Sequence, residues 1–97
     1  AMGEKKPRPW VHEIKCSPAE FDATRKGRKP FELRVDDRDY QAGDYLVERE
    51  FDEGAYTGRT FMARVTYTIR HGERYGELLA PNVVAMGLHP YRESRSI

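Results

Sequence analysis

The chain has 97 residues, which suits one domain with a single modest core, because a domain of this size buries roughly two thirds of its unfolded surface. Its 17 Lys and Arg residues nearly balance its 16 Asp and Glu residues, and the net charge of +1 argues against a uniformly basic face for duplex nucleic acid. The one cysteine, Cys16, excludes an intramolecular disulfide, and the three histidines lack partners at metal-ligand spacing. We therefore expect no metal and no cofactor.

No apolar run approaches the roughly 20 residues of a membrane span, and the start of the chain lacks the apolar core of a signal peptide. These features predict a soluble, cytoplasmic protein without a membrane partner. Residues 1–10 are polar and begin with Ala1-Met2-Gly3, which resembles the remnant of an expression tag, so we expect a flexible N-terminal tail. The domain is expected over residues 11–89, with a C-terminal tail over residues 90–97.

The first predicted strand covers residues 10–15, in which Trp10, His12 and Ile14 share one face. His12 is a candidate ligand contact, because an imidazole changes its charge near neutral pH. Its other interpretation is a hydrogen-bonded residue at the edge of the core. Spacing alone leaves both interpretations open.

The predicted helix covers residues 18–26. Ser17 is a capping residue, Pro18 suits the first helical position, and Glu20 stands three residues after the serine, as in a capping box. Gly27 supplies the left-handed conformation that commonly ends a helix. The apolar stripe of this helix is short and narrow, so we expect it to lie across a sheet.

Residues 27–34, with the sequence GRKPFELR, join this helix to the next strand, and we expect the function to lie here. Successive side chains of a strand point to opposite faces, so Glu32 and Arg34 share one face. The other face is expected to pack in the core, and it carries Phe31, Leu33 and Val35. Lys29 precedes a proline, which keeps its backbone extended.

We expect Lys29, Glu32 and Arg34 to converge on one hollow, suited to a planar and partly anionic ligand such as a nucleobase with its phosphate. Basic residues outnumber acidic ones over residues 25–38, which indicates a local nucleic-acid site. The alternative interpretation is a surface ion pair beside a solvated lysine, because exposed ion pairs are common and weak.

The rest of the chain reads as a loop over residues 36–44, then strands separated by turn-forming residues. A strand over 45–51 and a long strand over 61–70 are joined by a hairpin connection over 52–58. Within the long strand Tyr67 falls on the apolar face and is expected in the core. A loop over 71–82 precedes the final strand over 83–88. The predicted fold is mainly β, in the α+β sense: a small, partly closed β-barrel of about five strands with one capping helix.

Several segments, in this order along the chain, resemble the ASCH superfamily. They are His12-Glu13-Ile14-Lys15, the GRKPFELR stretch, Asp37-Arg38-Asp39-Tyr40, Gly43-Asp44, Tyr56-Thr57-Gly58-Arg59 and Val83-Val84-Ala85-Met86. Within this superfamily the chain is most similar to the small bacterial and phage branch named DUF3850, over about residues 11–88. The resemblance implies a PUA-like β-barrel, a fold associated with RNA binding, and a cleft beside the Gly-x-Lys-x-x-Glu-x-Arg motif as the ligand site.

One ASCH branch shares the Gly-Arg-Lys start of this motif and hydrolyses N4-acetylcytidine with a lysine, a threonine and a glutamate. Lys29 matches that lysine, whereas Glu32 stands where that branch has its threonine. The glutamate of that branch lies in a connection that is shorter here, where Glu73 and Glu77 are unaligned candidates. The resemblance therefore leaves hydrolysis open without transferring a complete catalytic set.

Three functions follow from these observations. The first is a binding module for RNA or a modified nucleoside, in which arginines hold phosphate or base edges and tyrosines stack a base. Its expected contacts are His12, Arg28, Lys29, Glu32, Arg34, Arg38, Tyr40 and Tyr56.

The second function is an amidohydrolase that acts on N4-acylated cytidine-type nucleosides. Lys29 is then the base or nucleophile, and Glu32 transfers the proton. An ion pair between the two would raise the Lys29 pKa and silence the amine. The third function is a non-catalytic protein-interaction or scaffold domain.

Overall fold

The computed structural model describes residues 6–91, so residues 1–5 of the expected N-terminal tail and residues 92–97 of the C-terminal tail lie outside the described residues. The elements are β1 (Val11–Cys16), α1 (Pro18–Arg25), β2 (Phe31–Val35), β3 (Tyr45–Asp52), β4 (Ala55–Arg70), the 3₁₀ turn η1 (Gly76–Leu78) and β5 (Val83–Pro90). The predicted mainly β fold of about five strands with one helix is confirmed. Within the described residues, no helix is long and apolar enough to cross a membrane.

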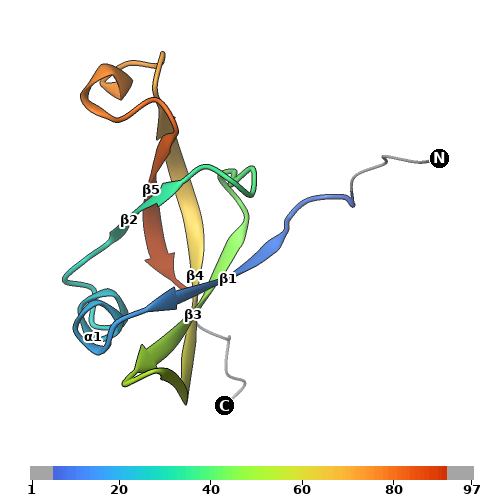
Figure 1. The fold of residues 1–97 in the computed structure, drawn as a ribbon. Helices are drawn as coiled ribbons and strands as arrows, with labels where there is room; N and C mark the ends of the chain where they lie inside the picture. The colour runs from blue at the N-terminus through green and yellow to red at the C-terminus, as the bar shows by residue number, and fades with distance from the viewer. Residues whose placement is uncertain (1–5, 92–97) are drawn as a thin grey trace.

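All five strands form one sheet in the order β1-β3-β4-β5-β2. β1 runs parallel to β3, and the other neighbouring strands pair antiparallel. The strands on either side of α1 in the sequence therefore lie at opposite edges of the sheet. The sheet is curled into a half-barrel, and α1 lies where β1 ends and β2 begins (Figure 1).

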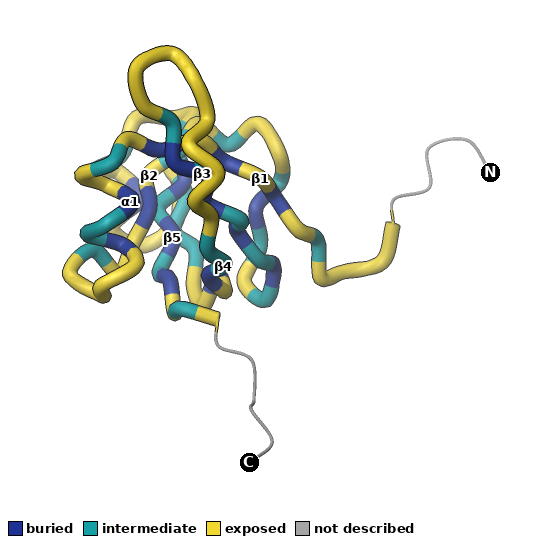
Figure 2. The backbone as a smooth tube through the Cα atoms, turned by 90° about the horizontal axis from the view of Figure 1, so that it is seen from below, coloured by how far each residue is buried: buried dark blue, intermediate teal, exposed yellow. Residues whose placement is uncertain are grey.

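Buried and exposed positions alternate along the strands (Figure 2). The buried positions form the core on the concave side of the curled sheet. Its members are Ile14, Tyr40, Leu46, Ala63, Val65, Val84, Met86 and Leu88, with Phe61 packed against them. Phe21 of α1 is fully buried, and its ring meets that of Phe61 edge-on at 5.2 Å between centroids. This contact seats the helix over one opening of the half-barrel, as predicted.

The predicted core face of β2 is wrong. Phe31, Leu33 and Val35 are 48%, 53% and 53% exposed, whereas Glu32 is 4% exposed. Glu32 pairs with Met86 and Arg34 with Val84, and paired residues share a face, so the two charged side chains lie on the concave side. Alternation assigns residues to two faces but does not say which one is inside. Because β2 is an edge strand, its inward face borders the opening of the half-barrel, where polar groups are tolerated.

The long strand also differs from prediction at both ends. β3 and β4 continue to a tight turn at Glu53 and Gly54, both with positive φ, so the expected seven-residue connection is mostly strand. Farther along, Val65 pairs with Leu88 and Tyr67 with Gly87, which leaves one extra residue between them. Such a bulge reverses the alternation. Tyr67, expected in the core, is therefore 68% exposed.

Candidate functional site

Lys29 and Glu32 meet at the end of the half-barrel that α1 covers. The Nζ atom of Lys29 lies 2.9 Å from Oε2 of Glu20 and 3.7 Å from Oε1 of Glu32. Burial opposes the charge on Lys29, but its hydrogen bond to Glu20 and the Glu32 carboxylate outweigh burial and raise the Lys29 pKa. The lysine is therefore a cation at neutral pH. For the hydrolase, the sequence allows Lys29 either as a free amine or as the partner of Glu32 in an ion pair, and the structure has the ion pair.

Glu48 of β3 is a buried carboxylate close to Lys29 and Glu32. The residue is 0% exposed, and neither carboxylate oxygen has a partner at hydrogen-bond distance and angle among the residues described; the nearby Cys16 thiol acts only to lower its pKa. Burial, and then the nearby charge of Glu32, raise the Glu48 pKa to about 7. Buried polar groups without a partner are rare in proteins and mark sites of strain or chemistry.

The surroundings of Glu48 are also titratable. Burial raises the Glu32 pKa, although Lys29 and Arg34 act against it. Burial and the charge of Glu48 raise the pKa of the Cys16 thiol to about 12, so this thiol stays protonated. We call Cys16, Lys29, Glu32 and Glu48 the inner cluster.

Sequence reasoning missed Glu48, although the signal is present. Leu46, Glu48 and Glu50 alternate on one face of β3, and Leu46 is a core residue. Two acidic side chains that share a face with a core leucine indicate buried carboxylates. Glu50 is satisfied, because it accepts a hydrogen bond from Thr57 at 2.8 Å and pairs with Arg59 at 3.3 Å.

A basic groove lies where the half-barrel stays open. β1 and β2 are the two edges of the sheet, and a pocket of about 510 Å³ lies beside both. Its lining, called the seam groove below, consists of Glu13, Ile14, Lys15, Arg34, Arg38, Arg49 and Tyr56. Four basic side chains thus surround one acidic side chain. Three of the predicted binding residues come together here, namely Arg34, Arg38 and Tyr56.

Side-chain contacts hold the groove in shape. Arg38 donates a hydrogen bond from Nη1 to the main-chain carbonyl of Glu13, which ties the loop after β2 to the edge of β1. At the other end, Tyr56 is 46% exposed, and the guanidinium of Arg49 lies 3.9 Å from the centre of its ring. The Phe51 ring meets Tyr56 edge-on at 5.2 Å. The groove therefore presents a fixed aromatic ring beside several cations.

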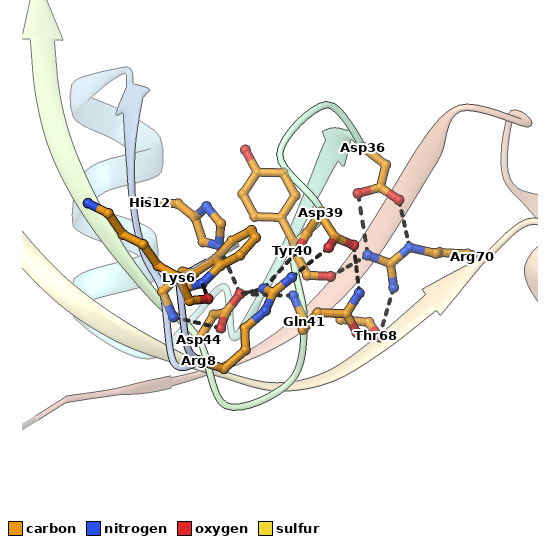
Figure 3. Close-up of polar contacts among 11 residues, drawn as sticks. Lys6, Arg8, His12, Asp36, Asp39, Tyr40, Gln41, Asp44, Thr68 and Arg70 are labelled. Carbon is orange, nitrogen blue, oxygen red and sulfur yellow. Dashed lines mark hydrogen bonds and ion pairs between the residues drawn. The ribbon is translucent and has the colours of Figure 1, made fainter. Parts of the chain in front are cut away.

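The loop that carries Arg38 is anchored at Arg70 of β4. Nε of Arg70 lies 2.6 Å from Oδ2 of Asp36, and a guanidinium nitrogen donates to the carbonyl of Tyr40 (Figure 3). Tyr40 itself is 0% exposed, and its ring lies 4.6 Å from that of His12. The structure thus places Tyr40 in the core, where a base from solvent does not reach its ring.

His12 and the segment before β1 share one buried carboxylate. Oδ2 of Asp44 lies 2.9 Å from Nε2 of His12 and 2.5 Å from Nη1 of Arg8, and Oδ1 accepts from the main-chain nitrogen of Trp10 (Figure 3). Burial acts against ionisation of Asp44, but these hydrogen bonds and the charge of Arg8 lower its pKa. His12 is therefore a hydrogen-bonded residue at the edge of the core, which was the second of its two interpretations. Arg8 and Trp10, which were expected in the N-terminal tail, therefore contact the domain.

Two further expectations from the sequence concern Arg28 and metal binding. Arg28 is exposed and lines neither the inner cluster nor the seam groove. Among residues 6–91, no three His, Cys, Asp or Glu side chains form a group that could hold a metal ion.

Comparisons with known proteins give a family and a phage relative. A family model described as "Domain of unknown function (DUF3850)" matches residues 11–84. The chain is 41% identical over 56 residues to the "Uncharacterized 12.9 kDa protein in GpA 3'region" of Escherichia phage P2. This match covers 58% of the chain and 51% of the relative, so it spans about half the length of that relative.

Proposed function

This chain belongs to the DUF3850 family, and from the chemistry of its seam groove we propose that it is a binding module for RNA or a modified nucleoside. The observation that carries the proposal is the gathering of Lys15, Arg34, Arg38 and Arg49 around an exposed Tyr56. The net charge of the chain is only +1, so this gathering is a local feature rather than the average of the surface.

Each part of the groove matches a part of such a ligand. Guanidinium groups carry five N–H donors in a fixed fork, which suits phosphate oxygens and base edges. An exposed aromatic ring stacks on any base, and this contact is worth about 1–3 kcal/mol per base. The resemblance of the sequence to the ASCH superfamily, with its PUA-like barrel, supports the same proposal.

The test is the affinity for a single-stranded oligoribonucleotide as a function of salt concentration. Each phosphate contact lowers the slope of log affinity against log salt by about 0.7 for single strands. We expect Arg34→Gln and Arg38→Gln to weaken binding and to flatten this slope. Tyr56→Ala should weaken binding at every salt concentration. Arg74→Gln is the matched control, because Arg74 is exposed and lies outside the groove. A salt-independent affinity, unchanged in the arginine variants, would contradict the proposal.

The unpartnered carboxylate of Glu48 favours a second candidate, hydrolysis of the amide in an N4-acylated cytidine. In this reaction a water oxygen bonds to the acyl carbon and the C–N bond breaks. Glu48 is 0% exposed, so this reaction requires the inner cluster to open to solvent. Glu48 then takes the proton from water and passes it to the departing amine nitrogen. Lys29 stays protonated and stabilises the developing oxyanion, which differs from the base or nucleophile expected from sequence.

Turnover of N4-acetylcytidine tests this second candidate. We expect Glu48→Gln to abolish turnover and Lys29→Met to reduce it. Glu50→Gln is the control, since Glu50 is a buried carboxylate on the same strand face that already has partners. Absence of turnover in the wild-type protein, or turnover that Glu48→Gln leaves unchanged, ends this candidate.

A further inference from the structure

A second pocket continues the seam groove along β1. It has a volume of about 590 Å³, and Lys6, Pro7, Pro9, Trp10, His12 and Arg38 are among its lining residues. Arg38 lines both pockets, and the β1 residues of this second pocket directly precede Glu13, with which the seam groove begins. The two pockets therefore form one surface along the free edge of β1, with Arg38 between them.

Trp10 is fixed in this second pocket. Its indole nitrogen donates to the carbonyl of Lys6 at 2.7 Å, and the guanidinium of Arg8 lies 3.5 Å from the centre of its ring. Arg8 is in turn paired with the buried Asp44 and with Asp39, at 2.5 and 2.6 Å (Figure 3). The ring is thus held in place before any ligand arrives, which lowers the entropy cost of using it as a stacking surface.

The two aromatic rings lie toward opposite ends of this surface. Lys15 pairs with Arg49, and Tyr56 pairs with Phe51 two residues beyond, so Tyr56 lies toward the C-terminal end of β1. Trp10 precedes the first residue of β1. Trp10 and Lys15 are five residue steps apart along extended chain, which is roughly 17 Å at about 3.3 Å per residue.

We infer that the ligand is a single-stranded RNA segment of more than one nucleotide, with one base at Tyr56, another at Trp10 and a phosphate at Arg38. This inference rests on the proposed function and adds the length of the ligand to it. A lone nucleoside is too short to contact both rings. Single-stranded segments bound across several aromatic side chains and a basic groove are a general mode of RNA recognition.

The experiment is a length series of oligouridylates, starting at the mononucleotide, with two readouts. Trp10 is the one tryptophan of the chain, so its fluorescence reports on the second pocket alone. We expect affinity to rise with length and Trp10 fluorescence to be quenched only by the oligomers. Trp10→Ala should weaken oligomer binding roughly tenfold or more and leave mononucleotide binding unchanged. Trp10→Phe should keep most of the oligomer affinity.

The outcomes separate this inference from the proposed function. Equal affinity for mononucleotide and oligomers, with fluorescence unchanged and with Arg34→Gln still weakening both, overturns the inference and leaves the proposed function standing. No binding of any member of the series overturns both. Because the fluorescence is read on the wild-type protein, the result does not depend on whether Trp10→Ala folds.

Discussion

The Nζ atom of Lys29 lies 3.7 Å from Oε1 of Glu32, so the cation at the end of the helix connection compensates a carboxylate that is 4% exposed. Its shorter contact, at 2.9 Å, is with Glu20, whose side chain is 54% exposed. These two ion pairs should differ in their effect on stability. Exposed pairs contribute about 0–1 kcal/mol, whereas removal of one partner from a buried pair leaves an uncompensated charge.

We expect Lys29→Met to lower the free energy of unfolding at pH 7.5 by about 1–3 kcal/mol, because Glu32 then loses its nearby cation. The raised pKa of Lys29 means that its contribution is fully present below the unfolded-state pKa and is lost only as pH rises through the folded-state pKa. Urea denaturation measures the change. Glu20→Gln is the control and should cost less than about 1 kcal/mol. An equal or larger effect of Glu20→Gln would show that the exposed pair dominates.

Glu48 should make stability fall as pH rises. Its folded-state pKa is raised from 4.5 to about 7, so the folded state holds the proton more tightly than the unfolded state. Stability is then lost between about pH 4.5 and pH 7 as the proton leaves. Glutamine does not titrate, so the Glu48→Gln variant lacks this loss. We expect the difference in free energy of unfolding between Glu48→Gln and the wild type to rise by about 2–3 kcal/mol from pH 5 to pH 8. The measurement is unfolding at both pH values. The control is Glu13→Gln, at an exposed position, whose stability should change with pH as that of the wild type does. If the stability of Glu48→Gln also changed with pH in parallel with the wild type, the raised pKa of Glu48 would be disproved.

Asp44 should affect the pH dependence of stability in the opposite direction from Glu48. Its folded-state pKa is lowered, so its contribution is present above the unfolded-state pKa of about 4 and is lost as pH falls through the folded-state value. At neutral pH we expect Asp44→Asn to cost about 2–4 kcal/mol, because Arg8 and His12 lose a buried acceptor. Thermal unfolding at pH 7 measures this loss. Asp39→Asn removes a more exposed partner of Arg8 and should cost clearly less; similar losses would place the anchor at Asp39 instead.

Tyr40 and Tyr67 offer a matched pair of substitutions. Tyr40 is 0% exposed and Tyr67 is 68% exposed, on the outer side of the bulge in β4. We expect Tyr40→Ala to lower the free energy of unfolding by about 3–5 kcal/mol, as large aromatic truncations in cores do. Tyr67→Ala should change it by no more than about 0.5 kcal/mol. Denaturant titration of both variants decides, and a large loss for Tyr67→Ala would mean that the bulge does not turn this ring outward.

Local signals in the sequence predicted the local structure well. Ser17 accepts a hydrogen bond from the main-chain nitrogen of Glu20 at 3.3 Å, so the predicted cap of the helix is confirmed. The strand positions were predicted from alternation and turn-forming residues, with the β3–β4 connection too long. The predicted closeness of Lys29 and Glu32 also needed little more than spacing, because only three residues separate them.

The sequence by itself thus determined the elements, their order and the half-barrel class, since caps, turns and alternation act over a few residues. Only the tertiary structure decided which face of β2 is inside, because that depends on pairing with β5 and on the edge position of β2. The same holds for the bulge that exposes Tyr67 and for the anchoring of Trp10 through Asp44. Those features arise from partners that are distant in sequence, and a pattern along the chain carries no information about what lies across the sheet.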